Sequence, residues 1–175
     1  MTSAEEALER FLASTAAVLA LLDETLGDER WRLRPEGEPW SLAETVEHVW
    51  LTDQSTLARL RDRLPASPIP PMEPRLPDAR ITAALFEGVP APPGLAEPSG
   101  RFVAREEGVA ALAKVRDGVV DAVRAHAPRL REHGLPHPVF GTLDGVQWIL
   151  FLGAHTDNHL PQVRRLRDAI RPRSA

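Results

Sequence analysis

The chain has 175 residues, of which 43% are hydrophobic and 26% are charged, and its net charge is −4. These values are typical of one globular domain spanning residues 1–175, and the negative charge argues against nucleic-acid binding. Cysteine is absent, which excludes disulfides, thiolate metal ligands and a cysteine nucleophile. The sequence has neither a signal-peptide pattern nor an apolar run long enough to span a membrane, so we expect a cytoplasmic protein without membrane partners.

The first half of the chain contains two stretches whose apolar residues recur at helical spacing. The first, about residues 4–26, follows a capping box that opens with Ser3. A second capping box opens with Ser41 and predicts a helix that starts at Leu42. This helix is expected to end at Pro65, because proline cannot continue a helix without losing a hydrogen bond.

Residues 65–100 differ in composition from the rest of the chain and contain more than half of its 17 prolines. Such a segment cannot form a long helix or a central strand. We predict a long crossover that packs over the helices, with one short turn of helix at 81–86. Loops of this length in compact domains often carry function, for example as lids.

The second half contains two further helical patterns, at about residues 102–127 and 143–169. Residues 134–141 are predicted to form a loop, and Thr142 is predicted to cap the last helix. No alternating strand pattern is present. Four amphipathic helices predict an all-α four-helix bundle, in which a long proline-rich crossover joins helices two and three.

Two histidines, His155 and His159, lie four residues apart in the last predicted helix. Both fall on the apolar stripe that also contains Leu152 and Val163, so both should face the interior. An i, i+4 pair of imidazoles can hold a divalent metal, with a third ligand from elsewhere. The alternative is a pair of core histidines that are hydrogen-bonded to neighbours, and the pair alone leaves both interpretations open.

The other histidines are less informative. His48 lies two turns into the second helix, near the edge of its apolar stripe, so periodicity gives only weak support for an inward-facing ligand. His126, His133 and His137 cluster around the end of the third helix and the following loop. We predict that these three lie at the surface.

Two polar residues are candidates for supporting metal-bound histidines. Asp53 falls in the centre of the apolar stripe of helix two, where an unpaired carboxylate would be costly. It should either support a histidine ligand or form a salt bridge with an arginine. Gln162 lies one turn beyond His159 and could line a pocket. Pro161, inside the last helix, predicts a local kink just past the pair His155 and His159.

Several motifs taken in order resemble the DinB-like (DinB/YfiT) family over essentially the whole chain. These are Trp40-Ser41 followed by His48, the proline-rich crossover, the stretch from His137-Pro138 to Thr142-Leu143, and His155-x3-His159-x2-Gln162. The resemblance implies a four-helix bundle in which His48, His155 and His159 bind a divalent metal, commonly nickel or zinc.

The resemblance also implies a class of function. Characterised members include S-transferases that depend on a low-molecular-weight thiol, and a mycothiol-dependent isomerase. We therefore expect a metal-dependent thiol transferase or hydrolase that acts on a small-molecule substrate. The alternatives are a non-catalytic metal- or ligand-binding bundle and a structural dimerising bundle with core histidines. A homodimer is expected because bundles of this family often pair, and Val115 and Val120 offer spare apolar positions.

Overall fold

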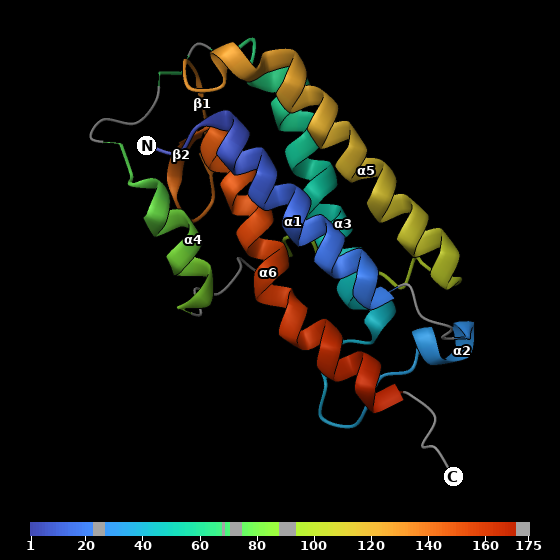
Figure 1. Cartoon of the computed structure of the whole chain (residues 1–175). Coiled ribbons are helices and arrows are strands. Elements are labelled where there is room, and N and C mark those ends of the chain that lie inside the picture. Colours follow the sequence, from blue (N-terminus) through green and yellow to red (C-terminus); the bar gives the residue numbers. More distant parts are fainter. Residues whose placement is uncertain (23–26, 68, 71–74, 88–93, 171–175) are drawn as a thin grey trace.

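A computed structural model of the protein describes residues 1–22, 27–67, 69–70, 75–87 and 94–170. Within these residues the architecture is a four-helix bundle, as predicted. Helix α1 packs against α5 and α6, and α3 packs against the same two helices, so that α1 and α3 lie diagonally opposite (Figure 1). The long helices are α1 (Ala4–Leu22), α3 (Leu42–Ala58), α5 (Arg105–His126) and α6 (Gly145–Ile170).

Both predicted capping boxes are present. The Ser3 hydroxyl accepts a hydrogen bond from the Glu6 amide, and the Glu6 carboxylate accepts one from the Ser3 amide. Ser41 and Glu44 make the same reciprocal pair at the start of α3. The predicted first helix reaches residue 26, but residues 23–26 lie outside the described residues.

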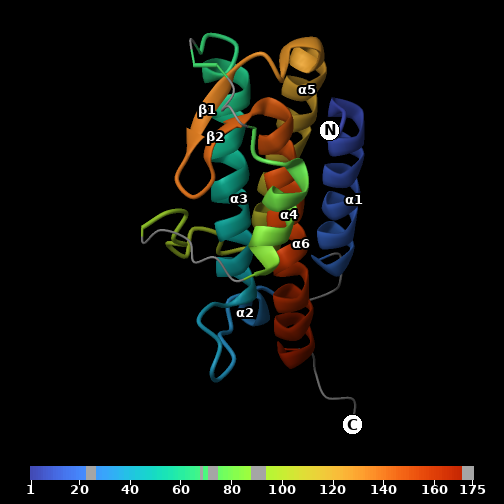
Figure 2. The same ribbon diagram turned by 90° about the vertical axis from the view of Figure 1, so that its left-hand side faces the viewer.

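Smaller elements connect the long helices. A single turn, α2 (Asp28–Trp31), follows α1, and the crossover contains α4 (Asp78–Phe86), which lies along α6 (Figure 2). Residues 68, 71–74 and 88–93 of the predicted crossover are outside the described part of the chain. Helix α3 passes directly into a π-helical turn, η1 (Arg59–Arg63), and a 3-10 turn, η2 (Ala127–Arg129), follows α5.

The loop prediction for residues 134–141 and the cap prediction for Thr142 are wrong. A two-stranded antiparallel hairpin, β1 (Gly134–His137) and β2 (Gly141–Asp144), leads into α6, and Thr142 pairs with Pro136 inside it. The N-terminal cap of α6 is Asp144, whose carboxylate accepts from the Gln147 amide at 2.9 Å. Strands of four residues are too short to give an alternating pattern.

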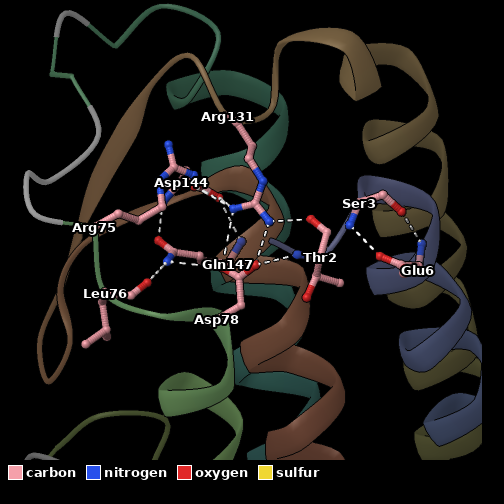
Figure 3. A network of polar contacts seen from close by, with 9 residues as sticks. All are labelled: Thr2, Ser3, Glu6, Arg75, Leu76, Asp78, Arg131, Asp144 and Gln147. Atoms are coloured by element: carbon pink, nitrogen blue, oxygen red, sulfur yellow. Dashed lines mark hydrogen bonds and ion pairs between the residues drawn. The ribbon is translucent and has the colours of Figure 1, made fainter.

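A network of charged groups anchors the N-terminus, the crossover and the hairpin to the start of α6 (Figure 3). The Asp144 carboxylate is fully buried and accepts hydrogen bonds from Arg131 and Arg75. Arg131 also pairs with Asp78 at 2.8 Å, and Asp78 accepts from the Thr2 amide at 2.8 Å. Each carboxylate in this network has a cation as partner, which is the condition under which buried charge is tolerated.

The positions predicted to form a dimer contact, and the length of the helices, can be compared with the structure. Val115 and Val120 are buried in the core of the chain itself, so they are not spare apolar positions. The homodimer stays a prediction. No helix in the described ranges has both the length and the apolar character that crossing a membrane requires.

Candidate metal centre

The structure brings His48, His155 and His159 together. One ring nitrogen of each lies within 4.8 Å of one nitrogen of the other two. His48 projects from α3, while His155 and His159 project from successive turns of α6. His48 and His155 are buried and His159 is half-buried. The shortest approach joins Nε2 of His48 to Nε2 of His155 at 3.1 Å.

The orientation of His48 is fixed by the crossover. Its Nδ1 lies 2.8 Å from the carbonyl oxygen of Ala96. Since a carbonyl can only accept a hydrogen bond, the proton is on Nδ1, and the lone pair is on Nε2, which faces the other histidines. Ala96 has φ of 54°, in the left-handed region that is unfavourable for a residue with a Cβ. The Trp40 ring packs against His48 with 4.8 Å between ring centroids.

Glu47 holds this part of the crossover in place. Its carboxylate is buried and accepts hydrogen bonds from the backbone amides of Ser99, Gly100 and Arg101, each at 2.9 Å. The Ser99 hydroxyl donates a further bond at 2.7 Å. Burial alone would raise the pKa of Glu47, but these hydrogen bonds outweigh it and lower the pKa below its usual 4.5. Glu47 therefore fixes the stretch of the crossover that contains Ala96.

His159 is oriented in the same manner by Gln162, which contacts this histidine but does not line the cavity beside it. The Nδ1 of His159 donates to Oε1 of Gln162 at 2.9 Å. The lone pair of His159 is then on Nε2. His155 differs, because its Nδ1 is buried without a hydrogen-bond partner among the described residues. Helix α6 continues through Pro161 as far as Ile170.

All three rings are neutral at pH 7. Burial, followed by the nearby His159, lowers the pKa of His48 from 6.5 to about 4, against the effect of the Ala96 hydrogen bond. Burial and the two neighbouring imidazoles lower the pKa of His155 well below 6.5. Burial also lowers the pKa of His159. Neutral imidazole is the form that binds metals.

The donor set fits a divalent metal. Bonds of 2.0–2.1 Å in a tetrahedral site place ligand nitrogens roughly 3.4 Å apart. The nitrogen–nitrogen distances in the cluster bracket this value, with 3.1 Å for the closest pair and 4.8 Å as the upper limit. In His48 and His159 the second nitrogen is held by an oxygen acceptor, which is the usual arrangement for metal-binding histidines. Three imidazoles without a thiolate suit nickel or zinc.

A cavity opens beside the three histidines and has a volume of about 250 Å³. Its walls come from α3, α6, the crossover and the hairpin, and they are mostly apolar, with Phe151, Phe140 and Leu95 among the lining residues. The Phe151 ring stacks on His155 with 5.6 Å between centroids. A mostly apolar cleft with a few convergent polar groups is the usual form of a small-molecule site.

Asp53 pairs with an arginine and not with a histidine. Its Oδ2 accepts from Nε of Arg116 at 2.8 Å, and both side chains are fully buried. Arg116 also donates to the hydroxyls of Thr15, at 2.9 Å, and Thr156, at 2.5 Å, and lies over the Phe11 ring. Burial raises the pKa of Asp53 from 3.8 to about 6, against the effect of Arg116. Of the two predicted roles for Asp53, the structure has the salt bridge.

The surface prediction for His137 is wrong. This histidine is buried in β1, with its ring packed among Phe140, Trp148 and Phe151. The sequence contains a signal for this burial. His137 is followed by Pro138-Val139-Phe140, and a turn at Pro138 lets the amides of Val139 and Phe140 donate to the His137 ring. His126 and His133 are half-buried near the end of α5 and lie apart from the cluster.

Comparisons with known proteins indicate the family and the fold of the chain. The sequence model described as the DinB superfamily matches residues 10–163. An uncharacterised protein of Bacillus subtilis (strain 168), YuaE, is 30% identical over 145 residues, which is 83% of this chain and 88% of that protein. The crystal structure of TT2238, a four-helix bundle protein, is similar with a TM-score of 0.59 at 26% identity, covering 91% of this chain and 96% of that one.

Proposed function

The chain belongs to the DinB superfamily, and we propose that it is a metal-dependent enzyme acting on a small molecule. Its metal ligands are His48, His155 and His159. The observation that carries the proposal is the direction of the lone pairs. His48 and His159 each give their Nδ1 proton to an oxygen, so both rings present Nε2 to a shared space beside a cavity.

The chemistry of the site follows from its ligands. A divalent ion such as nickel or zinc, held by three neutral imidazoles, lowers the pKa of a water or thiol in an open position. The apolar walls formed by Phe151, Phe140 and Leu95 limit the access of water and hold an electrophilic substrate. Glu47 and Ala96 keep the crossover, and with it His48, in the geometry that the ligand set requires.

Two reactions suit this arrangement. In the first, a low-molecular-weight thiol supplied from outside is transferred to the electrophile, which is consistent with a chain that has no cysteine. In the second, the same site hydrolyses its substrate with water. The cavity beside the histidines, with a volume of about 250 Å³, leaves room for a small substrate next to the ligands in either reaction. The thiol transferase is the first candidate because characterised members of the family include such enzymes.

The test is a pair of histidine substitutions. We expect elemental analysis to find about one nickel or zinc ion per chain in the native protein and in His126→Ala, and none in His155→Ala. Turnover of monochlorobimane with glutathione, mycothiol or bacillithiol should be present in the first two proteins and absent from the third. Circular dichroism should show unchanged helix in all three, since the two apolar clusters of the core do not depend on the histidines.

Three outcomes separate the alternatives. Metal in the native protein without turnover of monochlorobimane with any of the three thiols, and without hydrolysis of an ester such as p-nitrophenyl acetate, would favour a non-catalytic metal-binding bundle. Full activity in metal-free His155→Ala would contradict the mechanism. Absence of metal in native protein purified with nickel and zinc supplied would return the three histidines to a structural role.

A further inference from the structure

A second cavity, of about 230 Å³, adjoins the histidine cavity and shares with it the walls formed by His137, Phe151 and Leu95. It differs in its polar groups, because Arg59 and Ser55 line the second cavity only. No acidic side chain contributes to either wall within the described part of the chain.

Arg59 brings a cation to this second cavity. It is half-buried, and its guanidinium lies over the Trp148 ring at 5.2 Å from the centroid. Nη1 donates to the carbonyl and the hydroxyl of Ser55, and the ion pairs among the described residues do not include Arg59. Burial, followed by the nearby Arg63, lowers the pKa of Arg59. The guanidinium thus lacks the counter-charge that a partly buried cation normally has.

The backbone places Arg59 where it is. Arg59 is the first residue of the π-helical turn η1, and its carbonyl accepts from the Leu64 amide five residues on, at 2.8 Å. Such turns are rare, and they are frequently found at functional sites because they redirect side chains from the regular helical positions.

His137 supplies a second donor on the wall between the two cavities. Its Nδ1 accepts from the backbone amides of Val139, at 3.1 Å, and Phe140, at 3.3 Å. Nδ1 therefore has no proton, and the neutral ring has its proton on Nε2. Nε2 has no hydrogen-bond partner within the residues that the structure describes. The ring is held as a donor beside the cation.

We propose that the second cavity binds the carboxylate end of the substrate, between Arg59 and Nε2–H of His137, while the apolar part of the substrate lies along Phe151 and Leu95. One guanidinium and one neutral donor balance a single negative charge, and the planar fork of arginine matches a carboxylate. That the other end reaches the three histidines rests on the proposed function. The substrate class is then a small apolar carboxylate with its reactive group remote from the acid.

The experiment compares two probes of the same shape, phenylacetate and phenylacetamide, by calorimetry on the full-length protein after chelator treatment. Removal of metal ensures that the carboxylate cannot bind to an ion at the histidines. We expect the native chain to prefer phenylacetate, and Arg59→Gln to weaken its binding about 10- to 100-fold, as for loss of a charged hydrogen bond. Phenylacetamide binding should not change. Arg61→Gln, which removes an exposed cation bonded to Asp62, is the matched control and should bind both probes normally.

Further arms make the outcome decisive. Arg59→Lys, which retains charge without the fork, should fall between the native protein and Arg59→Gln. No preference for the carboxylate in the native protein, or an equal loss of both probes in Arg59→Gln, would overturn the proposal. Inorganic phosphate that displaces phenylacetate with equal affinity would show a general anion site and would also overturn it. Metal content measured on the same samples before chelation tests the proposed function separately, because the carboxylate preference does not depend on it.

Discussion

Helices α3 and α6 each contribute to two buried polar clusters, and the clusters differ in how their polar atoms are satisfied. In the first, Asp53 and Thr156 meet Arg116, all three nitrogens of which have an oxygen partner. In the second, His48 and His155 bring two ring nitrogens to 3.1 Å from each other, and His155 keeps one nitrogen without a partner.

This difference teaches which buried polar groups indicate function. We call the arginine cluster closed, because its cation, anion and hydroxyls are partners of one another, although Oδ1 of Asp53 is buried without a hydrogen-bond partner among the described residues. The charges of the network at the hairpin are likewise paired with one another (Figure 3). The histidine cluster is open, because His48 and His159 both direct an Nε2 lone pair into it, whereas the neutral ring of His155 has only one N–H to donate. Only the second cluster also borders a cavity. Burial, polarity and one buried atom without a partner are common to both clusters, whereas the convergence of neutral imidazoles and the cavity are specific to the histidine cluster.

The largest effect is expected in the closed cluster. Asp53→Leu leaves the guanidinium of Arg116 buried and without its counter-ion, which should lower the free energy of unfolding by about 3–5 kcal/mol. Metal affinity should stay within about twofold, because Asp53 bonds to no histidine in the structure. Urea unfolding and metal titration measure the two quantities.

The double variant Asp53→Leu/Arg116→Met is the control for this prediction. Replacement of a buried ion pair by apolar groups of similar volume is often neutral, so most of the lost stability should return. A marked loss of metal in the stable double variant would show that the clusters are coupled, and the comparison would fail.

The next effect is expected in the open cluster. Gln162→Leu removes the acceptor that holds the Nδ1 proton of His159, and loss of such a partner typically weakens metal binding by 10- to 100-fold. Gln162→Glu retains an acceptor and should bind metal at least as tightly as the native protein. Competition with a metal-sensitive dye measures both affinities, and equal binding by all three proteins would contradict the assigned role of Gln162.

The fold could be predicted from the sequence where its determinants are local. Capping boxes at Ser3 and Ser41 and the apolar stripes specify helix starts and faces without reference to the rest of the chain. The hairpin could not be predicted, because two four-residue strands rely on pairing with each other and on Gly141, whose φ is 75°.

Helical periodicity predicted the part of the candidate site on α6, whereas on α3 only the resemblance to the DinB-like family indicated His48. The spacing of His155 and His159 places both on one face, which is a property of the helix alone. Periodicity gave only weak support for His48 because residues 45–50 are all buried, so that this part of α3 has no exposed face. Their outer side is covered by the crossover, which Glu47 binds through amides more than fifty residues away, and periodicity holds no information about such contacts.

The acid response should also differ between the arginine cluster and His137, which lines both cavities beside the histidine cluster. Burial, followed by Arg59, lowers the pKa of His137 from 6.5 to about 4. Between these values the unfolded chain binds a proton that the folded chain does not. The contribution of His137 to the free energy of unfolding is therefore fully present above pH 6.5 and is lost as pH falls toward 4. Asp53 acts in the opposite direction, since a pKa raised to about 6 adds stability as pH falls.

His137→Phe tests this response in metal-free protein. The substitution keeps an aromatic ring among Phe140, Trp148 and Phe151 but removes the titration. From pH 7 to pH 5 the native protein should lose on the order of 2 kcal/mol more stability than the variant does. Parallel pH profiles of the two urea midpoints would assign the acid sensitivity to other groups.

The smallest effect concerns backbone strain, which lies on the side of the open cluster. Ala96 is the one residue other than glycine with positive φ in the described ranges, and its carbonyl orients His48. The left-handed conformation costs alanine about 1–2 kcal/mol, a cost that glycine does not have. Glycine, however, makes the unfolded chain more flexible, which offsets about 0.4–1 kcal/mol of this gain in stability. Ala96→Gly should therefore stabilise the fold by about 0.5–1 kcal/mol. Ala110→Gly, at an exposed position inside α5, should instead destabilise by about 1 kcal/mol.

If the strain serves to hold His48 ready for a ligand, as strained residues at functional sites do, the more stable Ala96→Gly protein should bind metal slightly more weakly. Stability and affinity that rise together would instead mean that the strain at Ala96 has no part in organising the histidines.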